Sequence, residues 1–363
     1  MSASGFSEFD RAMMARALGL AAKGLFTATP NPRVGCVIVQ GERIVGEGWH
    51  ERAGEPHAEM AALRAAGEAA AGATVYVSLE PCNHYGRTPP CAGALINARV
   101  ARVVAAMRDP HPTAAGGGQA LASAGIRFES GLLEDEAREL NIGFLSRVTR
   151  GRPWVRLKAA ATLDGRTALG RASGAAAGRS QWITGEAARE DGHLWRARAC
   201  AILTGIGTVK ADNPRLTVRA VETPRQPLRV IVDSRLETPA DARILQGEKV
   251  LVFAARAGAL PNAEVIELPN AAGKVDLPGM LRELARRGIN ELHVEAGFKL
   301  NGSLVREGCV DEVLLYLNPS FLGDTAEGIV DLAVPLSLEA RVPLRLRSLD
   351  RVGDDVRIVA RTA

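Results

Sequence analysis

Three residues with zinc-ligating side chains, and an acid beside one of them, occur in the first third of the chain. His57 precedes Glu59 by two positions, and Cys82 and Cys91 follow, each directly after a proline. One imidazole and two thiolates make a three-ligand zinc site that leaves the fourth position to water, as catalytic sites do. Glu59 would face the same cavity without being forced onto the metal, which suits a proton shuttle. The pattern therefore predicts a zinc site with His57, Cys82 and Cys91 as ligands and Glu59 as the catalytic acid and base.

Strands and helices alternate through the part of the chain that carries these residues. The expected elements are helices over Glu8–Lys23, His57–Ala71, Cys91–Ala98, Gln119–Ala124 and Leu133–Val148, and strands over Val34–Val39, Ile44–Trp49, Thr74–Leu79, Val100–Met107 and Ile126–Ser130. The alternation predicts a three-layer α/β domain with a mostly parallel sheet. Cys91 would begin a helix, where free N–H groups favour the thiolate over the thiol.

A second alternating series follows a polar junction, Arg147 to Pro153, that ends in glycine and proline. We therefore expect two domains, residues 1–150 and 151–363. The second should contain strands over Trp154–Ala159, Cys200–Thr204, Leu228–Val232, Lys249–Ala254, Glu291–Val294 and Asp311–Leu317, and helices over Gly185–Arg198, Leu277–Arg287 and Lys299–Glu307. The small residues of Ala168 to Gly178 predict a mobile loop.

Length and composition exclude several other classes of protein. A chain of 363 residues with 47% hydrophobic residues and a net charge of +4 is not globally disordered. The 41 acidic residues nearly match the 45 basic ones, and there is no long basic run, so we expect no nucleic-acid partner. We expect no membrane span and no signal peptide, because no long apolar stretch or basic-then-apolar start occurs. Five cysteines in so long a chain suggest free thiols in a reducing cytoplasm.

The spacing of the two cysteines points to a particular family. Zinc nucleobase deaminases combine H-x-E with P-C-x-x-C, whereas here eight residues, including His84-Tyr85-Gly86-Arg87-Thr88-Pro89-Pro90, separate Cys82 from Cys91. Together with Pro30 to Gly35 and Gly48 to His50, this string resembles the deaminase half of the bifunctional riboflavin biosynthesis deaminase/reductases.

The resemblance implies a cytidine-deaminase-like three-layer α/β/α fold for the first domain. It also implies a substrate pocket lined by Asn31, His50, His84 and Arg87, with Arg87 suited to a phosphate. His111 stands where the family usually has asparagine.

The second half is similar to the reductase half of the same family. Its matching strings are Thr162 to Ala168, Ser180 to Gly185, Leu203 to Val209 and Asp212 to Arg219. The resemblance implies a dihydrofolate-reductase-like α/β fold that uses NADPH. It would place Ala160, Trp182, Thr208, Asp212, Ser234 and Gly297 against NADPH, and Ser180, Arg196, Leu216, Arg219 and Glu295 around the ribose phosphate. Ala296 departs from the family's usual glycine. From the residues alone, the turns Gly205 to Thr208 and Glu295 to Gly297 could bring backbone N–H groups to a phosphate.

We therefore expect a bifunctional zinc hydrolase and NADPH oxidoreductase of riboflavin biosynthesis. It would deaminate 2,5-diamino-6-(5-phosphoribosylamino)pyrimidin-4(3H)-one and then reduce the ribosyl chain to give 5-amino-6-(5-phosphoribitylamino)uracil. The partners expected are this phosphorylated pyrimidine and further copies of the chain in a homo-oligomer.

Two alternatives remain open from the residues. One is a different zinc deaminase, acting on a nucleotide or on tRNA, with an unrelated second domain. The other is a non-enzymatic, metal-stabilised binding protein, which would place a fourth protein ligand on the zinc.

Overall fold

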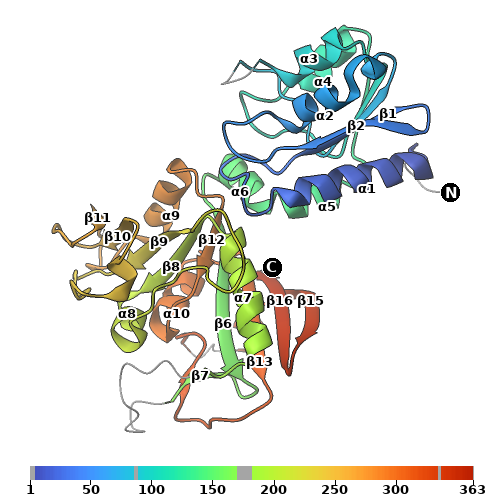
Figure 1. Cartoon of the computed structure of the whole chain (residues 1–363). Helices are drawn as coiled ribbons and strands as arrows, with labels where there is room; N and C mark the ends of the chain where they lie inside the picture. Colours follow the sequence, from blue (N-terminus) through green and yellow to red (C-terminus); the bar gives the residue numbers. More distant parts are fainter. Residues whose placement is uncertain (1–4, 86–88, 170–181, 334–336, 363) are drawn as a thin grey trace. The chain divides into compact units, whose positions relative to one another are not determined.

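The chain forms two compact units, Met1–Gly151 and Arg152–Ala363, in a computed structural model that describes residues 5–85, 89–169, 182–333 and 337–362 (Figure 1). Most of the loop expected over Ala168 to Gly178 lies outside the described residues. Among the helices that are described, none is long and apolar enough to cross a membrane.

The first unit is a five-stranded sheet between two layers of helices. Its elements are α1 (Glu8–Lys23), β1 (Gly35–Gln40), β2 (Arg43–Trp49), α2 (Ala58–Ala66), η1 (Gly67–Ala70), β3 (Thr74–Val77), α3 (Cys91–Asn97), β4 (Arg102–Ala105), α4 (Gly117–Ser123), β5 (Arg127–Ser130), α5 (Glu134–Leu140) and α6 (Ile142–Arg150). The strand order is β2-β1-β3-β4-β5, with α1 and α5 on one side of the sheet and α2, α3 and α4 on the other (Figure 1). The sheet is mixed rather than mostly parallel, because the β1–β2 hairpin makes β1 antiparallel to both of its neighbours.

Helix α1 is joined to the sheet through its first turn. The Ser7 hydroxyl accepts a hydrogen bond from the backbone N–H of Asp10, and the Asp10 carboxylate accepts one from the backbone N–H of Ser7, which together form a capping box. The same carboxylate accepts hydrogen bonds from the Tyr76 hydroxyl, at 2.7 Å, and from Arg102, at 2.5 Å. The start of α1 is thereby fixed to both β3 and β4.

Helix α2 lies unusually close to strand β2. A Cβ atom built on Gly46 would lie 2.2 Å from the backbone oxygen of Ala62, and one on Gly48 would lie 2.6 Å from that of Ala58. Any larger residue at these two positions would push the helix outward. The glycines and the facing alanines therefore set the depth at which α2, and the residues at its start, sit over the sheet.

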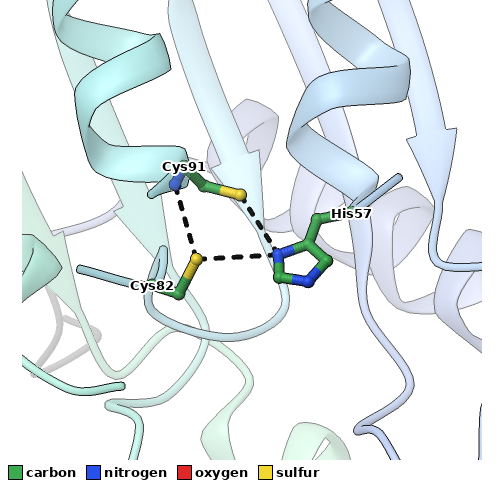
Figure 2. Close-up of side chains that lie close together, drawn as sticks. All are labelled: His57, Cys82 and Cys91. Carbon is green, nitrogen blue, oxygen red and sulfur yellow. Dashed lines mark hydrogen bonds between the residues drawn. The ribbon is translucent and has the colours of Figure 1, made fainter. Parts of the chain in front are cut away.

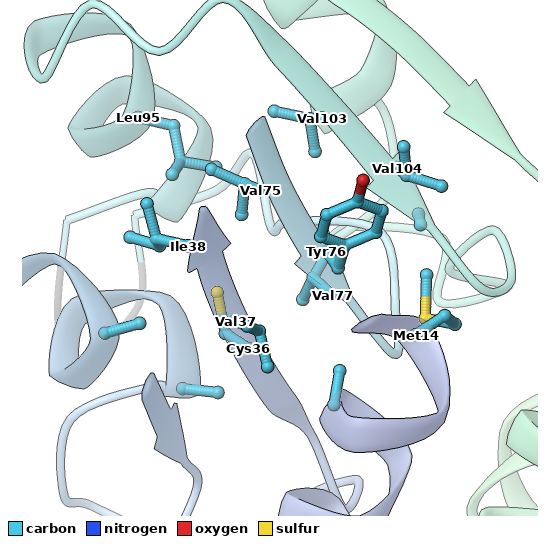
Figure 3. Close-up of a cluster of buried hydrophobic side chains, with 14 of the residues drawn as sticks. Met14, Cys36, Val37, Ile38, Val75, Tyr76, Val77, Leu95, Val103 and Val104 are labelled. Carbon is cyan, nitrogen blue, oxygen red and sulfur yellow. The ribbon is translucent and has the colours of Figure 1, made fainter. Parts of the chain in front are cut away.

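The core of the first unit fills both sides of the sheet. Alternate residues of β1 and β3 point to opposite faces, so that the helices of each layer meet an apolar surface (Figure 3). The largest contributors include Met14, Ile38, Leu95, Met107 and Leu121, all fully buried. Cys36 belongs to this core.

The single helix predicted over Leu133–Val148 is wrong. The structure has two helices, α5 and α6, that meet at Asn141, whose φ of −108° interrupts the helical path. The side chain of Asn141 is buried and pairs with the backbone of Arg33, accepting from its N–H at 2.8 Å and donating to its carbonyl at 2.9 Å. This contact between segments far apart in sequence outweighs local helix propensity.

The second unit is built on a nine-stranded sheet. Its elements are β6 (Trp154–Thr162), β7 (Arg166–Ala168), α7 (Glu186–Arg198), β8 (Ala201–Gly205), α8 (Ile206–Asp212), β9 (Leu228–Val232), η3 (Arg243–Leu245), β10 (Val250–Ala254), β11 (Ala263–Glu267), α9 (Leu277–Arg286), β12 (Glu291–Val294), α10 (Phe298–Arg306), β13 (Glu312–Asn318), β14 (Glu327–Gly328), η4 (Leu338–Ala340), β15 (Leu344–Val352) and β16 (Asp355–Thr362). The order is β11-β10-β9-β8-β12-β6-β13-β16-β15, parallel from β11 to β13 and antiparallel beyond (Figure 1).

All six strands and three helices expected here are present, with small shifts at their ends. Strands β11, β15 and β16, the short pair β7 and β14, and helix α8 were not predicted. Cys200 and Cys309 lie in one apolar cluster that packs on the sheet. The expectation of two α/β domains is confirmed.

We predict that Asn141→Ala loosens the first unit, because it leaves the buried N–H and carbonyl of Arg33 without the partners that Asn141 supplies. The cost should be roughly 2 kcal/mol or more. Hydrogen exchange in peptides covering β1 and α6 would then become about 30-fold faster. Gln119→Ala, which removes an exposed side chain, is the control and should leave exchange unchanged. Equal exchange in wild type and Asn141→Ala would contradict the explanation of the helix break.

Candidate zinc and substrate sites

The predicted zinc ligands converge in the first unit. Nδ1 of His57 lies 3.3 Å from Sγ of Cys91 and 3.6 Å from Sγ of Cys82, and the three ligand atoms are all within 4.8 Å of one another (Figure 2). The side chains come from the start of α2, the start of α3 and the segment before α3. Among the described residues, this is the one cluster of three or more metal-ligating side chains.

These distances fit a zinc ion. Tetrahedral zinc holds nitrogen at about 2.0 Å and sulfur at about 2.3 Å, which separates two such ligands by about 3.6 Å. The two nitrogen–sulfur distances in the structure, 3.3 and 3.6 Å, are close to that value. His57, Cys82 and Cys91 could therefore hold zinc with little rearrangement, through Nδ1 of the imidazole.

Two of the ligands are placed by helix starts. His57 is the residue that precedes α2, and its carbonyl accepts the N–H of Ala61. The close packing of α2 on Gly46 and Gly48 thus also sets the depth of His57. Cys91 is the first residue of α3 and is fully buried, and its backbone N–H points at Sγ of Cys82 at 3.4 Å.

The third ligand, Cys82, lies on a segment without regular structure that is fixed by neighbouring loops. The buried carboxylate of Glu80 accepts the N–H groups of Asp109, at 3.1 Å, and Gly118, at 2.8 Å. The N–H of Asn83 is bonded to the carbonyl of Ala114. Hydrogen bonds on both sides of Cys82 therefore fix its position, as the helix starts fix the positions of His57 and Cys91.

The electrostatics of the cluster favour thiolate formation. A hydrogen bond from Cys91 lowers the pKa of Cys82 to about 4, and donating that bond raises the pKa of the Cys91 thiol. The hydrogen bond with Cys82 likewise raises the pKa of His57. Without a cation, only one of the two cysteines is a thiolate, and the other remains a thiol. A divalent ion would allow both sulfurs to be thiolates.

Glu59 lies within the first turn of α2 and lines the same cavity as the ligands. Its side chain is buried, and this burial raises its pKa to about 7. The charge of His57 acts in the opposite direction. Glu59 is not part of the three-atom ligand cluster. Its pKa suits a group that takes up and releases protons near neutrality.

A cavity of about 500 Å³ opens beside the cluster, which is a usual size for a small-molecule site. Asn31 and His50 line it together, with Nδ2 of Asn31 3.0 Å from Nε2 of His50. Nδ1 of His50 lies 3.1 Å from the carbonyl of Pro56, so this nitrogen carries the proton and Nε2 accepts from Asn31. Burial lowers the pKa of His50, which keeps it neutral. The pair presents a fixed polar surface to a ligand.

His84 and His111 also line the cavity, whereas Arg87 lies outside the described residues. Nδ1 of His84 is buried and has no hydrogen-bond partner among the described residues. Nδ1 of His111 accepts from the N–H of Thr113 at 3.3 Å, so the neutral ring has its proton on Nε2. Both histidines therefore contribute to the wall of the cavity.

The cavity residues that the sequence missed include Glu80, Phe144 and Arg147. Glu80 directly follows a predicted strand and precedes the Pro-Cys pair, which is a detectable signal. Phe144 and Arg147 come from α6, near the end of the unit. Their place at the cavity depends on tertiary packing, and no local pattern could have found them.

In the second unit, two residues predicted to hold the ribose phosphate form a partly buried ion pair. Arg196, in α7, binds Glu295 through two parallel hydrogen bonds, one of them 2.7 Å between Nη2 and Oε2. Arg196 also donates to the carbonyl of Thr217. Although burial opposes ionisation, Arg196 holds the pKa of Glu295 well below its usual range.

Arg219 lies beside this pair. Its backbone N–H donates to Nδ1 of His193 at 3.3 Å, and its own side chain is exposed. Burial and then the charges of Arg196 and Arg219 lower the pKa of His193 to about 4, so that this ring is neutral. The sequence did not single out His193.

The two predicted glycine turns lie at the carboxyl ends of neighbouring parallel strands. Gly205 ends β8 and precedes α8, while Gly297 follows β12 and precedes α10. A Cβ on Gly297 would lie 3.5 Å from Oγ1 of Thr208, so the turns are adjacent. Helix starts at such a strand edge suit a pyrophosphate, which makes this a fit for NADPH. Ala296 packs against the core.

The other predicted residues of the second unit lie on several different elements. Trp182 is exposed and has the Arg189 guanidinium 4.1 Å from its ring centroid. Ser234 accepts the N–H of Val275, and Leu216 packs in a core cluster with φ of +51°. Asp212 ends α8, Ala160 lies in β6, and Ser180 lies outside the described residues.

Comparison with known proteins matches each unit to a family. Residues 7–107 match the cytidine and deoxycytidylate deaminase zinc-binding region, and residues 153–358 match the RibD C-terminal domain. The fold and sites thus define a two-domain enzyme that joins a zinc-dependent deaminase to a reductase.

Full-length relatives identify the family. The chain is 46% identical to the riboflavin biosynthesis protein RibD of Escherichia coli (strain K12), over 96% of this chain and 98% of the relative. The structure of Acinetobacter baumannii RibD is 40% identical, with a TM-score of 0.88 over 98% of this chain and 99% of that one. A diaminohydroxyphosphoribosylaminopyrimidine deaminase/5-amino-6-(5-phosphoribosylamino)uracil reductase from Thermotoga maritima is 32% identical, with the same TM-score and coverage. The chain belongs to the RibD family of riboflavin biosynthesis proteins.

Several expectations from the sequence are thereby confirmed. The first domain is cytidine-deaminase-like and the second is a RibD reductase domain. The protein is a bifunctional deaminase and reductase of riboflavin biosynthesis that uses zinc and NADPH. A deaminase with an unrelated second domain is excluded by the match over residues 153–358.

We predict that Cys82→Ser and Cys91→Ser each lose zinc, because a neutral hydroxyl replaces a thiolate ligand. Zinc measured by mass spectrometry after dialysis against a mild chelator should fall from about one ion per chain to well below half of that. Cys309→Ala is the matched control, since it removes a buried cysteine of the second unit and should leave zinc unchanged. Full zinc content in both serine variants would show that the ligands are misassigned.

Proposed function

We propose that the cavity of the first unit deaminates 2,5-diamino-6-(5-phosphoribosylamino)pyrimidin-4(3H)-one and that the second unit reduces the ribosyl chain of the product to give 5-amino-6-(5-phosphoribitylamino)uracil. The observation that carries this proposal is the convergence of His57, Cys82 and Cys91, next to Glu59, on a cavity of about 500 Å³. A three-ligand site open to a cavity supports catalysis over a purely structural role.

In the deaminase site, His57, Cys82 and Cys91 would hold the zinc ion. When bound there, zinc would lower the pKa of a water molecule, so that this water could lose a proton near neutral pH and act as the nucleophile toward the ring carbon that bears the exocyclic amine. Glu59 would take the proton from that water and deliver protons to the ring nitrogen and to the departing ammonia. Its buried carboxyl, with a pKa of about 7, can exist in both protonation states during the cycle.

The remaining deaminase residues would bind the substrate. Asn31 and His50 form a hydrogen-bonded pair at the cavity, and His84 also lines it. We propose that these three orient the pyrimidine and its ribose, and that Arg87 contacts the phosphate.

In the reductase site, NADPH supplies the hydride that reduces C1′ of the opened ribosylamine, and the protein positions the two molecules. The adjacent turns at Thr208 and Gly297 support a pyrophosphate site. The residues proposed to contact NADPH are Ala160, Trp182, Thr208, Asp212, Ser234 and Gly297. Those proposed to contact the substrate are Ser180, Arg196, Leu216, Arg219 and Glu295.

The ion pair between Arg196 and Glu295 makes Arg196 less available to the substrate phosphate than Arg219. An arginine already bound to a carboxylate has less to offer a phosphate, whereas the side chain of Arg219 is exposed beside the pair. We therefore assign the phosphate chiefly to Arg219, since a guanidinium fork matches phosphate oxygens. Glu295 suits the hydroxyl groups of the ribose.

We assign deamination to residues 1–150 and reduction to residues 151–363. The division of the chain into two compact units near this boundary supports the assignment. A reducing cytoplasm suits the protein, because its five cysteines are free thiols and two of them are proposed ligands.

We also propose a homo-oligomer, supported by strand β15 at the edge of the sheet. Three leucines of this strand, Leu344, Leu346 and Leu349, are 47–62% exposed. They pair with every second residue of β16, so their side chains lie on one face of the sheet. The mass of the purified chain in solution tests this.

The direct test of the proposed function incubates the purified chain with the diaminopyrimidinone ribosyl phosphate and NADPH. Mass spectrometry should show first the small mass gain that accompanies replacement of NH by O, with release of ammonia, and then a gain of two hydrogens that requires NADPH. Unchanged substrate, with zinc and NADPH both present, would overturn the proposal.

We predict that Glu59→Gln keeps its zinc and its fold but loses deamination. The amide cannot accept and return protons, and general acid–base groups typically contribute about 10²- to 10⁴-fold to the rate. Ammonia release and zinc content are measured on the same sample. Reduction of the separately supplied deaminated product serves as the internal control and should be unchanged. Deamination within tenfold of wild type would remove Glu59 from its assigned role.

We predict that Arg219→Ala raises KM for the deaminated, phosphorylated substrate about 10- to 100-fold, the worth of one charge-assisted contact. The Kd for NADPH, measured by fluorescence, should change less than about threefold. Arg215→Ala, an exposed arginine nearby to which no substrate contact is assigned, is the control. An equal loss of NADPH affinity would show that Arg219 faces the cofactor instead.

A further inference from the structure

Three basic residues follow neighbouring strands at one edge of the sheet of the second unit. Lys210 lies in α8, which follows β8, while Arg235 comes three residues after the end of β9 and Arg256 two residues after the end of β10. These strands are parallel neighbours, so the segments that follow them meet at the carboxyl edge, where open α/β sheets bind their ligands. Lys210, Arg235 and Arg256 are called the basic cluster below.

Glu237 ties the basic cluster together. Its carboxylate accepts a hydrogen bond from Nζ of Lys210 at 2.5 Å and lies 2.8 Å from Nε of Arg235. The hydrogen bond from Lys210 lowers the pKa of Glu237, and the charges of Arg235 and Arg256 act in the same direction. All three basic residues are exposed. Three cations beside one carboxylate leave this edge of the sheet with an excess of positive charge.

The loop after β9, which carries Arg235, is held in place by buried contacts. One oxygen of the buried Asp233 carboxylate accepts both the backbone N–H and the hydroxyl of Thr238, each at 2.7 Å. The N–H of Ala255 donates to the carbonyl of Ser234 at 3.1 Å, which joins the segments after β9 and β10. The arginines of the basic cluster are therefore carried by two segments of backbone that are fixed to each other.

The substrate residues indicate which half of NADPH would reach this edge. In the order β10-β9-β8-β12-β6, the glycine turns that suit the pyrophosphate follow β8 and β12. Glu295, proposed for the substrate, directly follows β12, and Ala160 lies in β6. Because the nicotinamide ring must reach the substrate, that half would lie toward β12 and β6. The adenosine half would then lie toward β9 and β10, where the basic cluster is.

NADPH differs from NADH in the phosphate on the 2′-oxygen of the adenosine ribose, and such a phosphate carries about −1.5 to −2 charges near neutrality. We infer that the basic cluster binds this 2′-phosphate and sets the preference of the second unit for NADPH over NADH. The inference rests on the proposed function, because it adds a phosphate subsite to the proposed NADPH site. Guanidinium groups form paired hydrogen bonds with phosphate oxygens, and an arginine near the ribose is a general means of accommodating a 2′-phosphate.

Two competing explanations give different results. If Lys210 and Arg235 serve only as exposed ion-pair partners of Glu237, their charges matter little and neither cofactor is affected by their loss. If Glu237 instead accepts a hydrogen bond from an unphosphorylated 2′-hydroxyl, as acids do in sites for NADH, its replacement weakens the binding of NADH. Comparing the two cofactors in the same variants separates these explanations from a phosphate subsite.

The experiment measures the Kd of NADPH and of NADH for the purified full chain, from the fluorescence of the bound cofactor. Arg235→Ala and Arg256→Ala should each raise the Kd of NADPH about 10-fold and change that of NADH less than about threefold. The double variant should bring the two Kd values close to each other. Where NADH binds too weakly for a Kd, the ratio of kcat/KM for the two cofactors gives the same preference.

Two further variants make the test specific. Glu237→Gln should lower the Kd of NADPH about twofold, because it removes a negative charge from beside the 2′-phosphate, and should leave that of NADH unchanged. Arg286→Ala is the matched control. Arg286 is an exposed arginine that pairs with a glutamate, Glu283, at 2.7 Å, and it ends α9, just before β12 begins at the opposite edge of the sheet. Its loss should leave both Kd values unchanged.

Each outcome decides the question. An unchanged Kd of NADPH in both arginine variants, or equal losses with the two cofactors, would overturn the assignment. Weaker binding of NADH to Glu237→Gln, or equal affinities of the wild type for NADPH and NADH, would overturn it as well. Wild-type protein that binds neither cofactor would instead overturn the proposed reductase function, which keeps the two failures distinct.

Discussion

Backbone-to-backbone packing between α2 and β2 is the constraint on which the deaminase site depends. Gly46 and Gly48 leave no side chain between the strand and the helix, and the oxygens of Ala58 and Ala62 occupy that space. The depth of α2 fixes two groups at once, because His57 immediately precedes the helix and Glu59 lies in its first turn. A methyl group at either glycine would move His57 and Glu59 together, relative to the two cysteines.

Cys82 and Cys91 are held by different contacts, so the geometry of the cluster depends on several elements of the first unit. Cys91 starts α3, whereas Cys82 depends on Glu80 and on the loop near Ala114. The cavity beside them is completed by α6 from the far end of the unit, and that helix begins only because Asn141 interrupts the preceding one to bind Arg33. In the second unit, the comparable organising contact is the pair of Arg196 and Glu295, which fixes a carboxylate at the end of β12.

Local sequence predicted most elements, but not contacts between distant segments. Alternating strands and helices and the H-x-E and cysteine spacings were enough to locate the sheets and the zinc cluster. The helix break at Asn141 could not be predicted, because its cause is the backbone of Arg33. Strand β15 was missed although its Leu-Arg-Leu-Arg alternation is typical of a strand. The pairing of Arg196 with Glu295, and the presence of Arg147 at the cavity, likewise arise only from tertiary structure.

The central claim is that three protein ligands hold zinc and leave its fourth position to the cavity. Zinc K-edge X-ray absorption on the purified full chain tests this most directly. The account predicts two sulfur ligands at about 2.3 Å, one imidazole nitrogen at about 2.0 Å and one further light atom that is not from a histidine ring. A spectrum with a third sulfur or a second imidazole would mean four protein ligands, and would contradict the open, catalytic character of the site.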